Sequence, residues 1–405
     1  VEPIPLWVLR RLPAFQAAAD VVRAVSKLRL SAATQRMLAG LPAPIQDQTS
    51  VLSTSSRASP APSPGAATAD LEGLGGVLLP FQAEAVKFGL EHGGKFLLGD
   101  EMGLGKTVTA LALARQYMTE WPVLVVAPAP LCIVWQEHAL TWLAEDLGPQ
   151  DVTVVRSSSD SPPKGTKMLI VSYNLISEGK FQRRPCDGKD WAVVILDECH
   201  MLRGAKSQRS QAAIPLAHRA KRALLLSGTP LVARAEDAHP LLDAVLPPGD
   251  LPSVAEFAAR YTEVRSQRPG AARSSSCRSA RRAGELHLLL GSIMLRRLKA
   301  DMLPQLPAKR RQRVMLELPS GCRSDATTGD EDCSGITDSA ELARACSTLA
   351  GTKASAVIEY MMCLLAGGSR FLLFAHHLRM LDELEKALKA NGIGYIRIDG
   401  STPMQ

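Results

Sequence analysis

The stretch Asp-Glu-Met-Gly-Leu-Gly-Lys-Thr at residues 100–107 decides the fold of this chain. It follows an apolar run at 96–99 that predicts a strand, and it leads into an Ala- and Leu-rich run at 108–117 that predicts a helix. A glycine-rich turn between a strand and a helix presents backbone N–H groups to anionic phosphate oxygens. In such a turn Lys106 would reach the β- and γ-phosphates, and the Thr107 hydroxyl would bind Mg²⁺. The stretch therefore predicts a phosphate-binding loop for a nucleotide.

The first position of this loop departs from the general pattern. That pattern, Gly-x-x-x-x-Gly-Lys-[Ser/Thr], begins with glycine, whereas Asp100 stands there in this chain. The alternative interpretation is a glycine-rich turn that carries Gly-Lys-Thr by chance, and the strand and helix on either side disfavour it. We expect the nucleotide to be bound by Asp100, Gly103, Gly105, Lys106 and Thr107.

Two acidic residues follow a second apolar strand, which is predicted at 193–196. Ligands bind at the carboxyl ends of parallel strands, so both acids are expected to face the nucleotide. Asp197 would hold Mg²⁺, and Glu198 would act as the general base that polarises the attacking water. His200 would couple this site to other motifs. An isolated Asp-Glu pair is often a helix N-cap, but its position after a buried strand favours the catalytic interpretation.

A third polar turn, Ser-Gly-Thr-Pro at 227–230, also follows an apolar run. The hydroxyl groups of Ser227 and Thr229 could hydrogen-bond to the carboxylates of the motif at 197–200 and so sense the γ-phosphate. By itself this sequence indicates only a turn, and its functional interpretation depends on its order after the other two motifs.

The composition sets broader limits. A chain of 405 residues is long enough for two or three domains, and a hydrophobic content of 46% supports buried cores. No apolar run approaches the ~20 residues of a membrane span. The net charge of +7 favours polyanionic partners only mildly. The eight cysteines include no Cys-x-x-Cys pair, which favours a reduced, intracellular compartment over disulfide or zinc frameworks. The chain begins at Val1 without a signal-peptide pattern, which is consistent with a fragment or an incomplete gene model.

Short apolar runs alternate with helix-like stretches from residue 78 onward. Almost wholly apolar strands between helices are typical of a parallel sheet buried on both faces, which places the chain in the α/β class. Strands are predicted at 96–99, 123–127, 152–155, 168–171, 193–196 and 223–226.

Changes in composition divide the chain into segments. A stretch rich in Ser, Ala and Pro predicts a disordered linker. Near the C-terminus, helices at 354–365 and 378–390 and strands at 370–375 and 395–398 predict the start of a second α/β domain. The expected division is a helical segment at 1–48, the linker at 49–72, a first α/β domain at 75–250, a linking helical region with basic and acidic insertions at 251–351, and an incomplete second domain at 352–405.

The order of the motifs resembles the motor core of superfamily-two helicases, in which a glutamine such as Gln82 precedes the phosphate loop. The sequence of the loop itself looks like that of Swi/Snf-type DNA translocases. Three later runs are similar to the annealing-helicase (HARP-like) subfamily, which rewinds DNA and remodels stalled replication forks. These runs lie at 285–289, 293–299 and 305–311.

The resemblance covers residues 75–405 and implies a RecA-like first lobe, followed by the start of a second RecA-like lobe. It implies ATP and Mg²⁺ as cofactors, with Gln82 reading the adenine edge. Residues 1–48 would be a remnant of an accessory module. DNA contacts are implied for Pro128 and Trp135, for Ser172 and Tyr173 in a turn, and for Arg296, Arg297 and Lys299 in a basic helix that links the lobes.

Three features depart from the family pattern. Cys199 stands where the family commonly has Ala or Ser, and the insertion at 269–284 is unusually rich in arginine. The last motor motifs, including the arginine finger that completes the ATP site from the second lobe, would lie beyond Gln405. The chain as written is therefore expected to bind ATP and to hydrolyse it weakly.

These observations predict an ATP-dependent DNA translocase, an annealing helicase that acts on forked or duplex DNA in replication-fork repair and restart. Its expected partners are duplex DNA, forks and single-strand/duplex junctions, with single-strand-binding or clamp proteins as further candidates and no membrane. The expected location is the nucleus. Two alternatives stay open: a nucleotide-binding interaction module with little turnover, and an RNA helicase, which the runs between 285 and 299 do not support.

Two smaller patterns also leave alternatives. Trp135 and Trp142 lie seven residues apart on one helical face, which favours a role in the core over a base-stacking platform. The basic run at 309–313 fits a nuclear-import or phosphate-contacting patch, and it fits a solvated basic face equally well.

Overall fold

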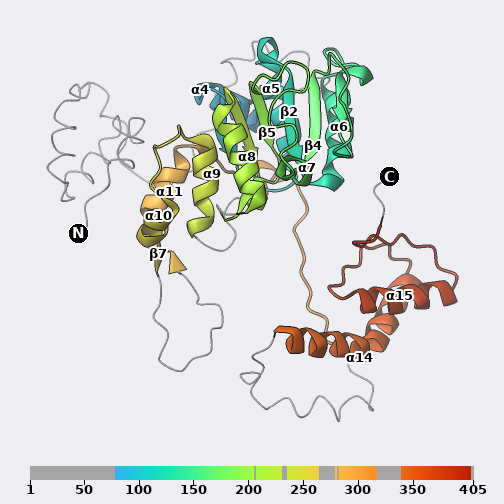
Figure 1. Ribbon diagram of the computed structural model, residues 1–405. Coiled ribbons are helices and arrows are strands. Elements are labelled where there is room, and N and C mark those ends of the chain that lie inside the picture. Colours follow the sequence, from blue (N-terminus) through green and yellow to red (C-terminus); the bar gives the residue numbers. More distant parts are fainter. Residues whose placement is uncertain are drawn as a thin grey trace. The chain divides into compact units, whose positions relative to one another are not determined.

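The computed structural model describes residues 78–204, 207–229, 235–263, 279–280, 282–316 and 339–402 (Figure 1). Two compact units follow one another in the chain, with the change from the first to the second at Leu306 and Pro307. The predicted helical segment at 1–48 and linker at 49–72 lie outside the described residues. The predicted domain boundaries at 250 and 352 stay predictions.

The first unit is built on a seven-stranded sheet in which every pair of neighbouring strands is parallel. The order across the sheet is β3-β4-β2-β5-β6-β1-β9, so the chain crosses over between strands as in other open parallel sheets. The predicted α/β class and parallel sheet are confirmed. The strands are β1 (Lys95–Leu98), β2 (Val123–Ala127), β3 (Val152–Val154), β4 (Met168–Ser172), β5 (Val193–Leu196), β6 (Arg222–Leu226) and β9 (Met294–Leu295).

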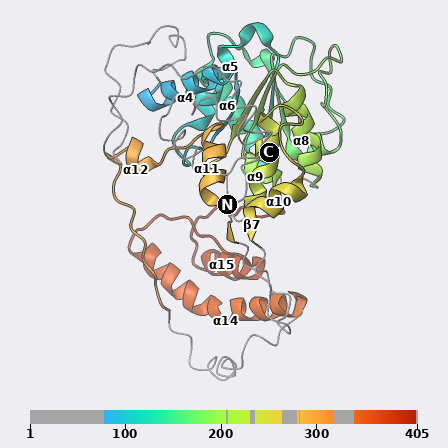
Figure 2. The same cartoon turned by 90° about the vertical axis from the view of Figure 1, so that its left-hand side faces the viewer.

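Helices cover both faces of this sheet, because side chains along each strand alternate between the faces. Phe96 and Leu98 of β1 point into one apolar cluster, and Leu97 between them points into the other. Figure 2 shows α4, α5 and α6 on one side of the strands and α8, α9 and α10 on the other. The helices of this unit are α4 (Pro80–Glu91), α5 (Lys106–Arg115), α6 (Cys132–Trp142), α7 (Tyr173–Ser177), α8 (Gln208–Arg219), α9 (Ala238–Val245), α10 (Val254–Tyr261), α11 (Ala283–Gly291) and α12 (Lys299–Met302).

The segment around Arg296, Arg297 and Lys299 differs from its prediction. These three residues were expected to lie in one basic helix, but Arg296 and Arg297 follow the edge strand β9 (Met294–Leu295) and α12 begins only at Lys299. Backbone N–H groups of Leu97 and Gly99 donate to the carbonyls of Ile293 (2.8 Å) and Leu295 (2.7 Å). A two-residue strand is too short to show a period in sequence, and the free edge of β1 stabilises it instead of a helix.

The second unit is helical in its described part. Two helices, α14 (Ser339–Ala366) and α15 (Leu378–Ala390), pack against each other, and they include both helices predicted there. The strands predicted at 370–375 and 395–398 are wrong, since residues 307–316 and 339–402 contain no strand. A strand needs a neighbouring strand for its backbone hydrogen bonds, and neither segment has one in these ranges. The assignment of residues 352–405 to a second RecA-like lobe stays a prediction.

In the described portion of the chain, no helix combines the length and the apolar character that crossing a membrane requires.

Candidate nucleotide-binding site

The loop between β1 and α5 has the backbone geometry of a phosphate cradle. Gly103 and Gly105 have φ angles of +85° and +80°, and Gly105 immediately precedes the first residue of α5. A side chain at Gly105 would be strained, and its Cβ would lie 2.4 Å from Nε2 of Gln82. The unpaired N–H groups at the start of α5 are available to an anion. The predicted arrangement of strand, loop and helix is confirmed.

The Lys106 side chain folds back over this loop. Its Nζ donates hydrogen bonds to the backbone carbonyls of Asp100 (2.9 Å) and Glu101 (3.4 Å). Burial lowers the pKa of Lys106, while the negative charges of Glu198, Asp100 and Asp197 act in the opposite direction. Phosphate oxygens are stronger acceptors than neutral carbonyls, so Lys106 can exchange these bonds for bonds to a nucleotide.

Asp197 and Glu198 follow directly after β5, as predicted. Asp197 is 7% exposed; its Oδ2 accepts a hydrogen bond from Trp135 Nε1 (2.8 Å), and its Oδ1 accepts one from the Glu198 backbone N–H (2.8 Å). Burial raises the pKa of Asp197, and these two hydrogen bonds oppose that effect. The carboxylate is thereby held in one orientation at the end of the strand.

Trp135 and Tyr173 support this acid from within the core. Their side chains are 1% and 2% exposed, and the Tyr173 hydroxyl donates to the Asp197 backbone carbonyl (2.7 Å). Both side chains are enclosed by the core, and DNA contact by Trp135 and Tyr173 stays a prediction. Ser172 caps α7, where its hydroxyl accepts a hydrogen bond from the Leu175 N–H (3.4 Å). DNA contacts by Pro128 and Ser172 stay predictions.

Replacing Trp135 by phenylalanine tests the support given to Asp197. The variant keeps most of the apolar volume and removes the hydrogen bond that the Trp135 indole donates to this buried carboxylate. We expect the free energy of unfolding to fall by about 2 kcal/mol, since a hydrogen bond to a charged group is lost. Mg²⁺-dependent nucleotide affinity should fall as well. Chemical denaturation and titration with a fluorescent ATP analogue measure the two effects.

The matched control is Trp191→Phe. Trp191 is 3% exposed, and its Nε1 donates to the neutral carbonyl of Phe181 (2.9 Å). This control should lose stability without losing nucleotide affinity. An equal loss of affinity in both variants would contradict a specific role for Trp135.

His200 joins the acid pair to the loop after β6. Its Nδ1 lies 3.0 Å from Glu198 Oε2 and 3.1 Å from Ser227 Oγ. The Ser227 hydroxyl was expected to bond a carboxylate of the motif at 197–200, but its partner there is the imidazole of His200. Thr229 contributes its backbone N–H, which donates to Ser227 Oγ (3.2 Å). The Ser227 backbone N–H donates to the carbonyl of Leu98 (3.1 Å), the last residue of β1 before the phosphate loop, so the three motifs meet at the ends of the adjacent strands β5, β6 and β1.

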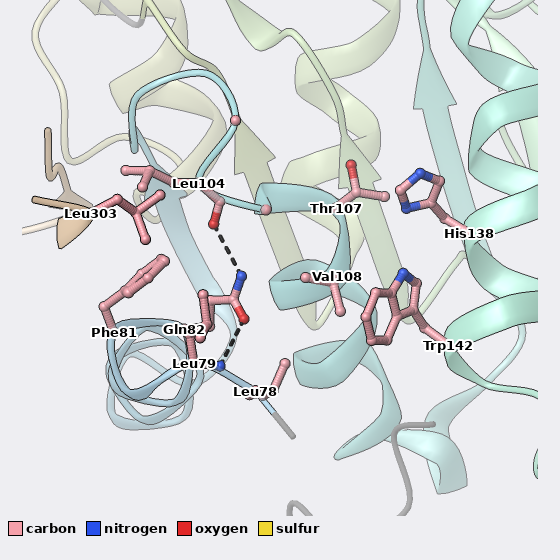
Figure 3. Close-up of a pocket in the computed structure, with 12 residues that line it drawn as sticks. Leu78, Leu79, Phe81, Gln82, Leu104, Thr107, Val108, His138, Trp142 and Leu303 are labelled. Carbon is pink, nitrogen blue, oxygen red and sulfur yellow. Dashed lines mark hydrogen bonds between the residues drawn. The ribbon is translucent and has the colours of Figure 1, made fainter. Parts of the chain in front are cut away.

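A pocket of about 320 Å³ opens beside the phosphate loop (Figure 3). Gln82 lies in its wall and is 8% exposed; its Oε1 accepts from the Leu79 N–H (3.0 Å), and its Nε2 donates to the Leu104 carbonyl (3.2 Å). Gln82 thus ties α4 to the loop, and its contact with adenine stays a prediction. The volume is in the range of small-ligand sites.

The opposite wall of this pocket comes from α6 and was missed from sequence. Figure 3 shows His138 and Trp142 across the pocket from Phe81 and Gln82. Nδ1 of His138 is buried without a hydrogen-bond partner among the described residues. Trp142 was expected in the core together with Trp135, and the spacing along α6 gave no sign that the two indoles face different surroundings.

The predicted DNA-contacting residues after β9 lie against the phosphate loop. Arg296 and Arg297 belong to no helix, and both guanidinium groups bind loop residues. The Lys299 backbone N–H donates to Glu101 Oε2 (2.8 Å), and a Cβ at Gly103 would meet Lys299 Nζ at 2.7 Å. Contact of these three residues with DNA stays a prediction.

The residues present fit Mg²⁺ as a cofactor. Thr107, which lines the pocket, carries a hydroxyl, and the Asp197 carboxylate has lone pairs beyond the two that accept hydrogen bonds. Both donors are hard oxygens, and Mg²⁺ typically takes few protein ligands and completes its shell with water and phosphate oxygens. Among the ranges that the structure describes, no group of three or more His, Cys, Asp or Glu side chains could hold a metal ion by itself.

A phosphate loop, an acid pair and a serine-containing turn at three adjacent parallel strands define the P-loop class of nucleotide-binding proteins. Within this class, the model of the SNF2-related domain matches residues 81–346. The chain belongs to this family.

Two relatives and one solved structure illustrate the similarity. The DNA annealing helicase and endonuclease ZRANB3 of Bos taurus is 36% identical over 80% of this chain and 31% of its own length. The SWI/SNF-related matrix-associated actin-dependent regulator of chromatin subfamily A-like protein 1 of Xenopus tropicalis is 37% identical over 81% and 35%. The Sulfolobus solfataricus SWI2/SNF2 ATPase core in complex with dsDNA is 18% identical, with a TM-score of 0.48 over 78% of this chain and 71% of that one. The chain spans about a third of the length of the curated relatives it matches.

Proposed function

We propose that this chain is the ATP-hydrolysing motor of a DNA translocase that anneals DNA at forked or duplex sites. The observation that carries the proposal is the connection of the three motifs at the ends of β5, β6 and β1. The names of the relatives, a DNA annealing helicase among them, support DNA as the substrate. A role in replication-fork repair and restart, and a nuclear location, follow from the same similarity as parts of the proposal.

In the proposed reaction, Lys106 leaves its two backbone carbonyls and binds the β- and γ-phosphates. Glu198 takes a proton from the attacking water. The His200 imidazole, 3.0 Å from the Glu198 carboxylate, holds that carboxylate in place. When bound, Mg²⁺ would neutralise charge that develops on the phosphates, and Thr107 and Asp197 are the residues that would hold it. The link from His200 to Ser227 connects this chemistry to the loop after β6.

An ATPase assay with different nucleic acids tests the function. Phosphate release by the purified protein is measured without nucleic acid and with forked DNA, blunt duplex, single-stranded DNA and a forked RNA of the same sequence. We expect forked DNA to stimulate turnover most and RNA least. Stimulation by RNA above that by DNA would favour an RNA helicase. Tight ATP binding without turnover on any of these substrates would favour a nucleotide-binding interaction module.

A further inference from the structure

The Arg297 guanidinium joins the phosphate loop to α4. Its Nε and Nη2 donate to the two carboxylate oxygens of Asp100 at 3.1 and 2.6 Å, and the Arg297 backbone N–H donates to Asp100 Oδ1 at 3.0 Å. Its Nη1 donates to the Phe81 carbonyl and lies 3.6 Å from Glu84 Oε2. The guanidinium carbon lies 5.3 Å from the centroid of the Phe81 ring. One side chain therefore holds the first residue of the loop and a wall of the pocket together.

Arg296 contacts the opposite side of the same loop. Its Nη1 donates to the carbonyls of Gly99 (2.7 Å) and Gly228 (3.3 Å), which connects the phosphate loop to the turn after β6. The backbones of the two segments are also joined, since the Glu101 N–H donates to the Arg297 carbonyl (3.0 Å). Two consecutive arginines thus bind the start of the phosphate loop: Arg297 joins it to α4, and Arg296 joins it to the turn after β6.

The burial of the Asp100–Arg297 pair argues against a DNA contact for Arg297. The side chains of Asp100 and Arg297 are 2% and 10% exposed. If Arg297 turned towards a DNA phosphate, Asp100 would stay behind as a buried charge without its partner, which is strongly unfavourable. The pair also explains the departure from the general loop pattern, because glycine at position 100 would offer no carboxylate to the Arg297 guanidinium.

We propose that Arg297 is a positioning residue of the nucleotide site, with Asp100 as its fixed partner, and that it does not contact DNA. It acts through the loop and through Phe81, which lines the pocket, and so it sets the affinity for ATP. The inference rests on the proposed function only in that the pocket binds ATP.

The test is Arg297→Lys. Lysine keeps the charge but replaces a planar fork by one ammonium, which cannot bind both Asp100 oxygens and the Phe81 carbonyl at once. We expect KM for ATP to rise roughly tenfold, the effect of losing one charge-assisted hydrogen bond, while kcat at saturating ATP is retained. The affinity for DNA and its dependence on salt should be unchanged. The control is Arg183→Lys, an exposed arginine in the loop between α7 and β5.

A second variant guards against a simple folding defect. In Asp100→Asn/Arg297→Gln, a pair of neutral side chains replaces the ion pair, so no buried charge is left without a partner. Thermal unfolding confirms that each variant is folded. The double variant should raise KM for ATP by less than the product of the fold-changes of the single variants Asp100→Asn and Arg297→Gln, because the two residues act through one contact.

Two results would overturn the proposal. One is unchanged affinity for ATP in both Arg297→Lys and the double variant. The other is weaker DNA binding by Arg297→Lys with a salt slope reduced by about one, the signature of a lost phosphate contact. Affinity is read by equilibrium titration with a fluorescent ATP analogue, which requires no hydrolysis. If the unmodified protein bound ATP without DNA-stimulated turnover, the proposed function would fail while this test would still decide the role of Arg297.

Discussion

Replacing Lys106 by alanine is expected to lower DNA-stimulated ATP turnover at least about a hundredfold, the loss seen when one preorganised donor to a developing charge is removed. The carbonyls of Asp100 and Glu101 hold the ammonium at the loop, so it needs only to exchange these bonds for bonds to phosphate. Nucleotide affinity should fall too, because the same cation stabilises the ground state. Phosphate release and titration with a fluorescent ATP analogue measure the two effects.

The matched control for this variant is Lys180→Ala, since Lys180 is exposed and lies in the loop between α7 and β5. It should hydrolyse ATP at the rate of the unmodified protein. Unchanged turnover in Lys106→Ala would remove the basis for placing ATP in this loop.

The second large effect is expected for Glu198→Gln. The amide is nearly isosteric but cannot take a proton from water, so kcat should fall by about a thousandfold, within the usual range for general-base catalysis. KM for ATP should change little, because Glu198 is assigned no contact with the bound nucleotide. Single-turnover kinetics should show ATP bound and not cleaved.

The geometry supports Glu198 as the base in preference to Asp197. Asp197 is enclosed and bonded to Trp135, whereas the Glu198 carboxylate is paired with His200 and about a quarter of its side chain is exposed. Glu178→Gln at the exposed end of α7 serves as the control. Full turnover by Glu198→Gln would assign the base to another residue.

The parts of the fold and site that could be predicted from sequence are those with a local signal. The central strands at 123–127 and 193–196 were predicted to the residue, because wholly apolar runs between helices have few other interpretations. The parallel arrangement then brings the loop at 100–107, the acids at 197–198 and Ser227 to one edge of the sheet, since all three follow strand ends.

The remaining parts depend on partners that are remote in sequence. Asp100 and Arg297 are separated by 197 positions, and no local sequence pattern around either residue predicts that they pair. Trp135 was named both as a DNA contact and as a core residue, and its hydrogen bond to Asp197, 62 positions away, places it in the core. The apolar runs at 370–375 and 395–398 carry a strand pattern, but a pattern cannot supply the neighbouring strand that a sheet requires.

The short edge strand β9 has a mechanical consequence. Three backbone bonds, donated by Leu97, Gly99 and Glu101, join β1 and the phosphate loop to the stretch from Ile293 to Arg297 as the chain leaves the sheet. Because the two stretches run in parallel, a pull along this exit strand shears all three bonds together and does not peel them apart singly. Tension on the chain beyond Lys299 would therefore act directly on the phosphate-binding loop. The loop would then bear mechanical load in addition to binding the nucleotide.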